Sequence, residues 1–184
     1  LKTYLEYKPL FENENFLIQQ FSKKILEIKN IKEFISKILK RYYKINVIVF
    51  RVVHGGRNYK SPMIMTDKVL VGIKEGEKLA PIHNSILLQW YEEIKTIIKK
   101  DVLCIACFDT SFFYKLPKIS KVYAIPLNIS KKYKIQKLGF HGFAHQSMLA
   151  QLEQLLGGFR NKKKVITLQL GGGTSITASF NGKP

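Results

Sequence analysis

The amino-acid sequence predicts a mixed α/β fold. Segments whose apolar residues recur at the spacing of an α-helix alternate along the chain with short runs of β-branched residues, which are typical of buried strands. The chain has 184 residues, of which 46% are hydrophobic, so it can bury a core as one domain or as two small lobes. Alternation of this kind favours a layered α/β protein, in which ligand sites form where strands end.

Two consecutive helices are predicted between residues 14 and 43. Asn30 separates them, and lysines lie between the apolar positions of both. The apolar positions are Phe16, Ile18, Phe21, Ile25 and Ile28 in the first helix and Ile31, Phe34, Ile35, Ile38 and Leu39 in the second. The period then changes, and residues 45–53 (INVIVFRVV) predict a buried strand that leads into a glycine-containing loop at residues 54–57.

Further elements are predicted in the second half of the chain. Asn84 is a good N-cap for a helix with apolar residues from Leu87 to Ile98, and residues 102–108 predict a second buried strand. A proline-containing, aromatic stretch follows from residue 111 to residue 135. A helix from about His145 to Leu156 is predicted next, with Gly157 and Gly158 closing it. Its apolar face is predicted from Met148, Leu149, Leu152, Leu155 and Leu156. Residues 165–170 and 174–180 predict two strands joined by a glycine turn.

The formal net charge of +18 comes almost entirely from lysine, and the four arginines are Arg41, Arg51, Arg57 and Arg160. The lysines are dispersed along the chain, which favours solvated faces over a nucleic-acid interface. A non-catalytic basic binding domain is nevertheless kept as an alternative. No apolar run reaches the ~18 to 20 residues needed to cross a bilayer, and no signal-peptide pattern is seen, so a cytoplasmic location without a membrane partner is expected.

Cys104 and Cys107 form a Cys-x-x-Cys pattern inside the predicted strand at residues 102–108. Side chains three residues apart on a strand point to opposite faces, so these thiols are not expected to share a metal or a disulfide. We expect both to be buried, unpaired small hydrophobic residues.

Candidate functional residues gather where strands end or helices begin. Arg51, at the end of a strand and near glycines, suits a carboxylate or phosphoryl group, although a structural ion pair is the alternative. His83 precedes a predicted helix N-terminus, where anions are favoured, or it has no role beyond the capping region. Asp109 ends the second strand and can hold magnesium through water or orient a nucleophile; otherwise it is a capping or turn residue.

A fourth candidate is His141, which stands between glycines just before a helix and can donate a hydrogen bond to a transferring phosphoryl group. His141 and His145 could suggest zinc, but Gly142 makes a shared helical face doubtful and no third ligand is nearby, so no metal ligand is assigned. The turn formed by Gly171, Gly172 and Gly173 can place backbone amides against phosphate, but glycines are common in any hairpin.

Taken together, these blocks resemble the acetate kinase family. The matching segments, in order, are RVVHGG (51–56), APIHN (80–84), FDTSF (108–112), GFHG with a histidine three residues later (139–145), and a strand with a glycine turn ending in Asn-Gly-Lys (165–183). The resemblance runs from about residue 47 to residue 183. It implies part of the two-lobed α/β fold shared by acetate and sugar kinases, heat-shock ATPases and actin, with residues 1–110 in the N-terminal lobe and 111–184 beginning the C-terminal lobe.

The resemblance also implies a reaction and roles for particular residues. The expected activity is transfer of a phosphoryl group between ATP and acetate or propionate, with Mg²⁺, by a cytoplasmic enzyme whose full-length form is a homodimer. Arg51 and Asp109 match catalytic residues, and His141 matches the histidine that hydrogen-bonds the phosphoryl group in transit, with His83 supporting it. Val53, Ile82 and Phe140 match the apolar wall beside the acetate methyl group. Gly171, Gly172 and Gly173 match the turn that faces the nucleotide phosphates.

The sequence departs from the family pattern in two motifs. Phe143 and Ala144 replace a threonine and a serine, and Gln169 and Gly172 replace a histidine and an asparagine. These changes affect groups that would face ATP phosphate. The family's first phosphate loop is expected before this segment, and its second arginine, adenosine pocket and magnesium-binding glutamate after it. We therefore expect an internal fragment that is inactive alone, and a decayed, inactive kinase remnant is a further alternative.

Overall fold

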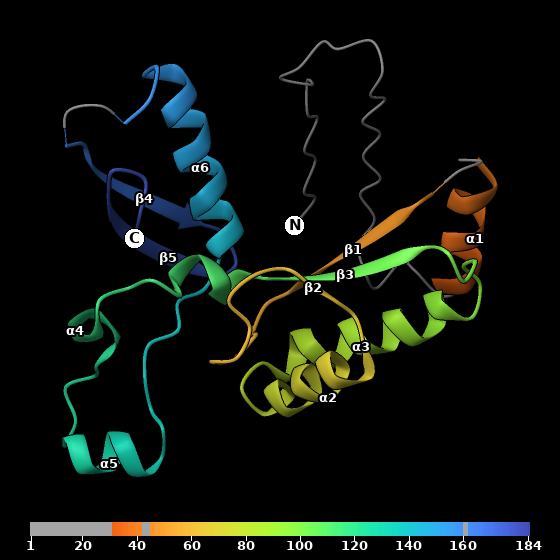
Figure 1. The fold of residues 1–184 in the computed structure, drawn as a ribbon, viewed down its shortest axis with the longest axis horizontal. Coiled ribbons are helices and arrows are strands. Elements are labelled where there is room, and N and C mark those ends of the chain that lie inside the picture. Colours follow the sequence, from red (N-terminus) through yellow and green to blue (C-terminus); the bar gives the residue numbers. More distant parts are fainter. Residues whose placement is uncertain (1–30, 42–44, 160–161) are drawn as a thin grey trace.

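The computed structural model describes residues 31–41, 45–159 and 162–184 (Figure 1). The helix predicted from Phe16 to Ile28 lies outside the described residues. The helix predicted from Ile31 is confirmed as α1, Ile31–Arg41. Within the described residues, no helix is both long enough and apolar enough to cross a membrane. The structure is mixed α/β, as predicted.

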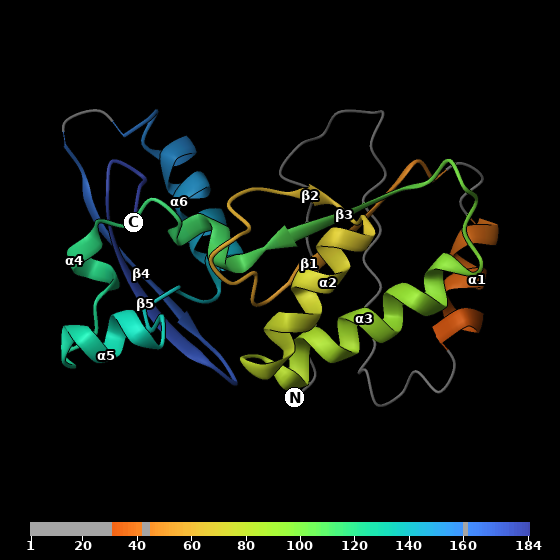
Figure 2. The same ribbon diagram turned by 60° about the horizontal axis from the view of Figure 1, so that its bottom comes forward.

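A three-stranded sheet organises the first part of the molecule (Figures 1 and 2). Strand β1, Val47–Val52, pairs in parallel with β3, Leu103–Phe108, and the short strand β2, Met63–Ile64, pairs antiparallel with the other edge of β3. Both long strands end at the same edge of the sheet because they are parallel, with Val52 opposite Phe108. The ends of the two strands are therefore neighbours in space although they are far apart in sequence.

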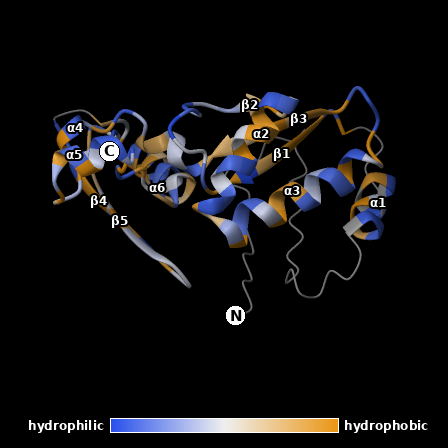
Figure 3. Ribbon diagram, turned by 90° about the horizontal axis from the view of Figure 1, so that it is seen from below, coloured by the Kyte–Doolittle hydropathy of each residue, from blue (hydrophilic) through white to orange (hydrophobic). Residues whose placement is uncertain are grey.

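Helices α2, Asp67–Glu75, and α3, Pro81–Lys95, cover one face of this sheet, with the short 3₁₀ helix η2, Gly76–Lys78, between them. The hydrophobic strands contrast with the mixed colouring of the helices in Figure 3, as expected when only one side of each helix faces the core. The buried core comprises Phe50, Val52, Met65, Val69, Ile73, Tyr91, Ile94, Ala106 and Phe108. This core holds the ends of β1 and β3 in place. Neither β2 nor α2 was assigned from the sequence.

The second part follows β3 without a long linker. It begins with the 3₁₀ helix η3, Asp109–Phe113, and continues through the short helices α4, Lys118–Lys121, and α5, Leu127–Lys132. Helix α6, Gly142–Leu155, then packs on η3 and on the hairpin formed by β4, Lys164–Leu170, and β5, Thr174–Phe180 (Figure 1). The hairpin and its glycine turn agree with the prediction.

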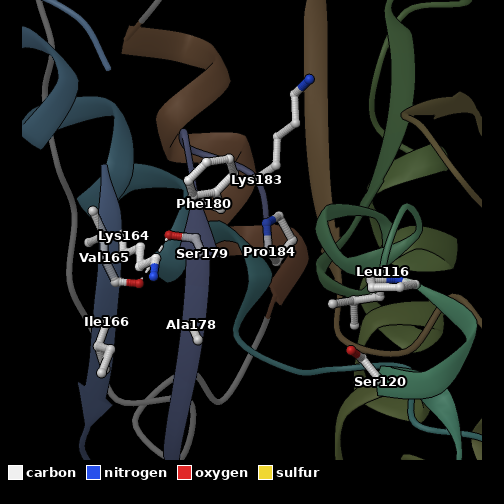
Figure 4. A pocket seen from close by; sticks show the side chains of 11 residues that line it. Leu116, Ser120, Lys164, Val165, Ile166, Ala178, Ser179, Phe180, Lys183 and Pro184 are labelled. Atoms are coloured by element: carbon white, nitrogen blue, oxygen red, sulfur yellow. Dashed lines mark hydrogen bonds between the residues drawn. The ribbon is translucent and has the colours of Figure 1, made fainter. Parts of the chain in front are cut away.

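The hairpin has a polar inner face and an apolar outer face. On the inner face, next to α6, Thr167, Thr177 and Ser179 are buried. On the outer face, Ile166 and Ile176 are 64% and 68% exposed. Figure 4 shows part of the outer face bordering a cavity of about 650 Å³, with Leu116 and Ser120 on the opposite wall. The hairpin therefore presents uncovered apolar surface.

Two helices begin earlier than predicted. Helix α3 begins at Pro81 rather than near Asn84, because proline suits the first helical position, where its missing N–H costs nothing. Asn84 is therefore buried inside the helix and is not its N-cap. Helix α6 begins at Gly142 rather than at His145, and His141 adopts the left-handed conformation at its N-cap (φ 54°).

Two burial predictions were also wrong. Leu155 and Leu156, which we assigned to the apolar face of α6, are 84% and 48% exposed, whereas Leu149 on the same helix is buried. Cys104 and Cys107 are free thiols, as predicted, but each is only partly buried. Partial burial raises the pKa of both thiols.

Candidate active site

Arg51 and Asp109 form an ion pair at the edge where β1 and β3 end. Arg51 Nη2 donates to Asp109 Oδ2 at 2.6 Å, and Arg51 Nε donates to Asp109 Oδ1 at 3.3 Å. Asp109 is fully buried, while the side chain of Arg51 is 55% exposed. The parallel register of the two strands thus joins residues 58 positions apart. The buried carboxylate fixes the guanidinium, whose remaining N–H groups are free to meet an anion from solvent.

A hollow of about 320 Å³ lies beside Arg51. Its lining includes Val53 and also Ile82 and His83 from the first turn of α3. Ile82 is 71% exposed, so this wall is open to solvent. His83 thus lies within the helix, whereas we had predicted that it precedes the helix N-terminus. Apolar side chains next to a guanidinium suit a small molecule with a short alkyl group and a carboxylate.

Phe140 does not line the hollow beside Arg51. It packs instead against His54, with ring centroids 5.8 Å apart, and borders a second hollow next to the β4–β5 hairpin. The main chain of His54 is fixed by Asn84, whose Nδ2 donates to the His54 carbonyl oxygen at 3.0 Å. Burial lowers the pKa of His54, which favours the neutral imidazole. His54 and Asn84 thus brace the loop after β1, a role that sequence analysis missed.

The N-terminus of α6 lies directly against Asp109. A Cβ atom at Gly142 would lie 1.9 Å from the carbonyl oxygen of Asp109, so only glycine allows this approach. The backbone N–H of Phe143 is directed at Asp109 Oδ1, 3.5 Å away. Helix α6 therefore brings His141, the residue before Gly142, to the same strand edge as Arg51 and Asp109. The three residues that we predicted to be catalytic gather in one region.

His141 and His145 share a partner on the hairpin. Ser175 Oγ lies 3.0 Å from His141 Nδ1 and 2.8 Å from His145 Nε2. His141 is the left-handed N-cap of α6 and not part of the helix, so the two rings are brought together by Ser175 and not by a shared helical face. His145 is fully buried. Its pKa is lowered first by burial and then by the nearby His141, while Asp109 acts in the opposite direction.

Ser175 and Thr167 were missed in the sequence analysis. A signal was available, because Ser175, Thr177 and Ser179 alternate with apolar residues along one strand. Such alternation indicates that one face of the hairpin meets polar groups rather than a hydrophobic core.

The glycine turn of the hairpin lies beside His141. A Cβ atom at Gly173 would lie 3.2 Å from Cε1 and 3.5 Å from Nε2 of His141, whereas one at Gly172 would meet nothing within 4 Å. Gly171, Gly172 and Gly173 are all exposed, so their backbone is open to an approaching group. The exposed turn therefore presents its backbone beside the His141 imidazole.

The described residues hold no cluster of metal-ligating side chains. They include no group of three or more His, Cys, Asp or Glu side chains placed to hold a metal ion. Both carboxylate oxygens of Asp109 already accept hydrogen bonds from Arg51.

Comparison with known proteins agrees with the motifs. Residues 11–184 match the model of the Acetokinase family. The chain is 37% identical over 158 residues to an acetate kinase of Thermosipho africanus, covering 86% of this chain and 39% of that protein. It is 37% identical over 146 residues to an acetate kinase of Acetivibrio thermocellus, covering 79% and 36%. The chain thus spans about 39% of the length of the first of these curated relatives and 36% of the second.

Solved structures give the same result. A crystal structure of Porphyromonas gingivalis acetate kinase matches with a TM-score of 0.73 and 32% identity, covering 82% of this chain and 40% of that one. A propionate kinase from Francisella tularensis matches with a TM-score of 0.74 and 34% identity, covering 82% and 39%. Both the sequence and the arrangement of elements are therefore shared.

Proposed function

Since this chain belongs to the acetokinase family, we propose that its site forms part of the active site of an acetate or propionate kinase. The supporting observation is the exposed guanidinium of Arg51, anchored on buried Asp109, at the rim of an apolar hollow. In this proposal the carboxylate of the substrate lies on Arg51, and its alkyl group lies against Val53 and Ile82. Phe140, which packs elsewhere, is not given a substrate contact.

The proposed reaction moves the γ-phosphoryl group of ATP onto a carboxylate oxygen. A bond forms between that oxygen and phosphorus, the bond from phosphorus to the β-phosphate oxygen breaks, and acyl phosphate and ADP result. No protein base is required, because a carboxylic acid of ordinary pKa is already ionised at neutral pH. The protein's task is to position the groups and to stabilise their charge.

The chain's own residues divide this task. Arg51 would neutralise the attacking carboxylate and one phosphoryl oxygen, His141 would donate to another phosphoryl oxygen, and His83 would border the substrate. Gly171, Gly172 and Gly173 would offer backbone N–H groups to the nucleotide phosphates. Asp109 would hold Arg51 rather than contact the substrate.

The remaining parts of the proposal follow from family membership. ATP would be the phosphoryl donor, and its Mg²⁺ would take ligands other than the described residues. We propose a cytoplasmic, homodimeric enzyme, with residues 1–110 belonging to its first lobe and residues 111–184 opening its second. The change from sheet to hairpin after Phe108 supports this division.

Substrate binding can be tested on the chain itself by following the methyl resonances of Val53 and Ile82 by NMR. Acetate and propionate are expected to shift both signals, and acetamide, which has the same shape without the charge, is expected to shift neither. Removing Arg51 alone would leave the Asp109 carboxylate buried and unpaired. The informative variant is therefore Arg51→Ala combined with Asp109→Asn, which should lose binding.

Two control variants complete the test. Asp109→Asn alone keeps the guanidinium and should still bind acetate. Arg57→Ala removes an arginine of the same segment whose guanidinium donates to the Lys134 carbonyl oxygen, outside the hollow, and should leave binding unchanged. Equal shifts with acetate and acetamide, or acetate binding that survives in the double variant, would contradict the proposal.

A further inference from the structure

The loop that follows β1 is held in place by side chains. Three consecutive backbone N–H groups donate to them: His54 N–H to Asn84 Oδ1 at 3.4 Å, Gly55 N–H to Thr110 Oγ1 at 3.2 Å, and Gly56 N–H to His54 Nδ1 at 3.2 Å. His54, Asn84 and Thr110 are all buried. The position of the loop therefore depends on the side chains that accept these hydrogen bonds.

Asn84 makes the most hydrogen bonds in this group. Its Nδ2 donates to the His54 carbonyl oxygen at 3.0 Å and to the carbonyl oxygen of Ile73, near the end of α2, at 3.3 Å. One carboxamide thus binds both the N–H and the carbonyl group of His54, as a neighbouring strand would. We call this contact the Asn84–His54 clamp. It is closely packed, because a Cβ atom at Gly76 would lie 3.1 Å from both Asn84 Nδ2 and the His54 carbonyl oxygen.

The clamp joins the two walls of the hollow beside Arg51. One wall comes from β1 and from Val53, the residue before His54. The other wall comes from α3 and includes Ile82 and His83, the two residues before Asn84. The clamp therefore lies one residue beyond the lining residues of both walls.

Hydrophobic packing is not what places the first turn of α3. Among residues 81–85, Asn84 alone is buried. The contacts of α3 with the hydrophobic core begin at Leu87, about one turn further along the helix. The first turn is thus held against β1 by a buried amide, and its partners would be left buried and unsatisfied without it.

We propose that Asn84 is a positioning residue that fixes the width of the hollow beside Arg51 and so favours short carboxylates over longer ones. The inference rests on the proposed function, since it takes the occupant of the hollow to be a carboxylate held by Arg51. A methyl group as small as that of acetate can contact Val53 and Ile82 together only when the two walls are close. A longer alkyl chain can reach both walls when they are further apart, so its binding depends less on the clamp.

The test compares acetate with butyrate on the 184-residue chain, with the methyl resonances of Val53 and Ile82 followed by NMR during each titration. Asn84→Ala removes the clamp and should weaken acetate binding more than butyrate binding. The ratio of the two dissociation constants should change by about fourfold for each additional methylene that the wider hollow accommodates, the equivalent of burying one CH₂ group. A purely structural role would weaken the binding of both ligands alike and leave the ratio unchanged.

Gly76→Ala is a milder second variant that decides the matter if Asn84→Ala does not fold. The backbone of Gly76 is right-handed helical (φ −72°), which alanine adopts readily, and the new Cβ would press on the clamp. The ratio should change in the same direction by a smaller factor. Ser85→Ala is the matched control, because Ser85 lies next to Asn84 on α3 but is exposed. It should leave the ratio as it is in the wild-type chain.

A measurement without ligand tests the clamp by itself. The His54 N–H should exchange with solvent about two- to tenfold faster in Asn84→Ala, as expected for the loss of one hydrogen bond, and at the wild-type rate in Ser85→Ala. An unchanged ratio, or unchanged exchange of this N–H, in whichever of the Asn84 and Gly76 variants folds would overturn the inference.

The two measurements separate this inference from the proposed function. If neither carboxylate shifts the Val53 and Ile82 signals of the wild-type chain, the proposed function is contradicted and the size preference falls with it, while the exchange rates still report on the clamp. If the wild-type chain binds acetate and the variants keep its ratio, only the role assigned to Asn84 is wrong.

Discussion

At the scale of single residues, Asp109 and His145 have similar positions but opposite electrostatic roles. Asp109 is buried and charged, and it is stabilised by Arg51, a residue that keeps half of its own surface in water. His145 is buried and held between two hydroxyl groups, which accept or donate as required and bring no charge. The first residue anchors a cation at the site, while burial lowers the pKa of the second and favours its neutral form.

Stability is expected to fall as the solution becomes acidic. Burial lowers the pKa of both His54 and His145 from the ordinary value of 6.5, so the unfolded chain binds protons more readily than the folded one. The resulting stability is complete above pH 6.5 and is lost as pH falls below it. The urea concentration at the midpoint of unfolding, measured between pH 7.5 and pH 5, reports this loss of stability.

The urea concentration at the midpoint of unfolding should fall over that range. A flat profile in the wild-type chain would mean that neither buried ring stays neutral.

At the scale of elements, two contacts place the site. The parallel pairing of β1 and β3 joins Arg51 to Asp109, and the approach of α6 to η3 brings His141 next to them. The second contact depends on Gly142, where the backbone of one helix meets the carbonyl oxygen of another element without an intervening side chain.

Gly142→Ala is therefore expected to move α6 away from Asp109. Its Cβ would lie 1.9 Å from a backbone oxygen that has little freedom to shift. Overpacking of this kind costs on the order of 1–3 kcal/mol or more in unfolding free energy. Gly172→Ala is the matched control, since it adds the same methyl group in open space. Comparable urea midpoints for the two variants would show that α6 does not need this close approach.

At the scale of the whole molecule, both the sheet and the hairpin leave apolar side chains exposed, and those of the hairpin lie on its outer face. The sheet has α2 and α3 on one face, whereas the hairpin's outer face exposes Ile166 and Ile176. Large exposed apolar patches mark surfaces that associate with other protein or aggregate.

We expect the 184-residue chain to self-associate through the hairpin's outer face. Replacing Ile166 and Ile176 together by threonine keeps β-branched side chains and removes apolar surface. The double variant should show weaker self-association by analytical ultracentrifugation with unchanged circular dichroism. The matched control is Val71→Thr, an exposed position on α2, which should leave association as it was. Association that persists undiminished in the double variant would show that another surface of the chain mediates self-association.

The chain as it stands is expected to give no measurable acyl phosphate from Mg-ATP and acetate. Loss of one electrostatic stabiliser typically lowers the rate by about 100- to 1000-fold, and the described residues include no group of three or more His, Cys, Asp or Glu side chains placed to hold a metal ion. Trapping with hydroxylamine is the direct assay. Fusion to the remaining segments of a related acetate kinase should restore turnover, and Arg51→Ala should abolish it. Turnover by the 184 residues alone would mean that they assemble a metal site that the fold does not suggest.

The sequence by itself determined the local elements and the residue types of the site. Residues 47–52, 103–108 and the hairpin were predicted because β-branched runs and glycine turns are decided by neighbours along the chain. Arg51, Asp109 and His141 were predicted as site residues from their chemistry and from the resemblance of the motifs to a known family. The helix starts at Pro81 and Gly142 were missed, because the more conspicuous Asn84 and His145 suggested later ones.

Only the tertiary structure decided which partners these residues have. The register of the parallel strands places Arg51 beside Asp109. The packing of α6 on the hairpin places Ser175 beside both His141 and His145. It also turned Phe140 toward His54 and left the cysteines partly exposed. Such contacts join residues as far apart as His54 and Phe140, and local sequence carries no information on them because they depend on how whole elements pack.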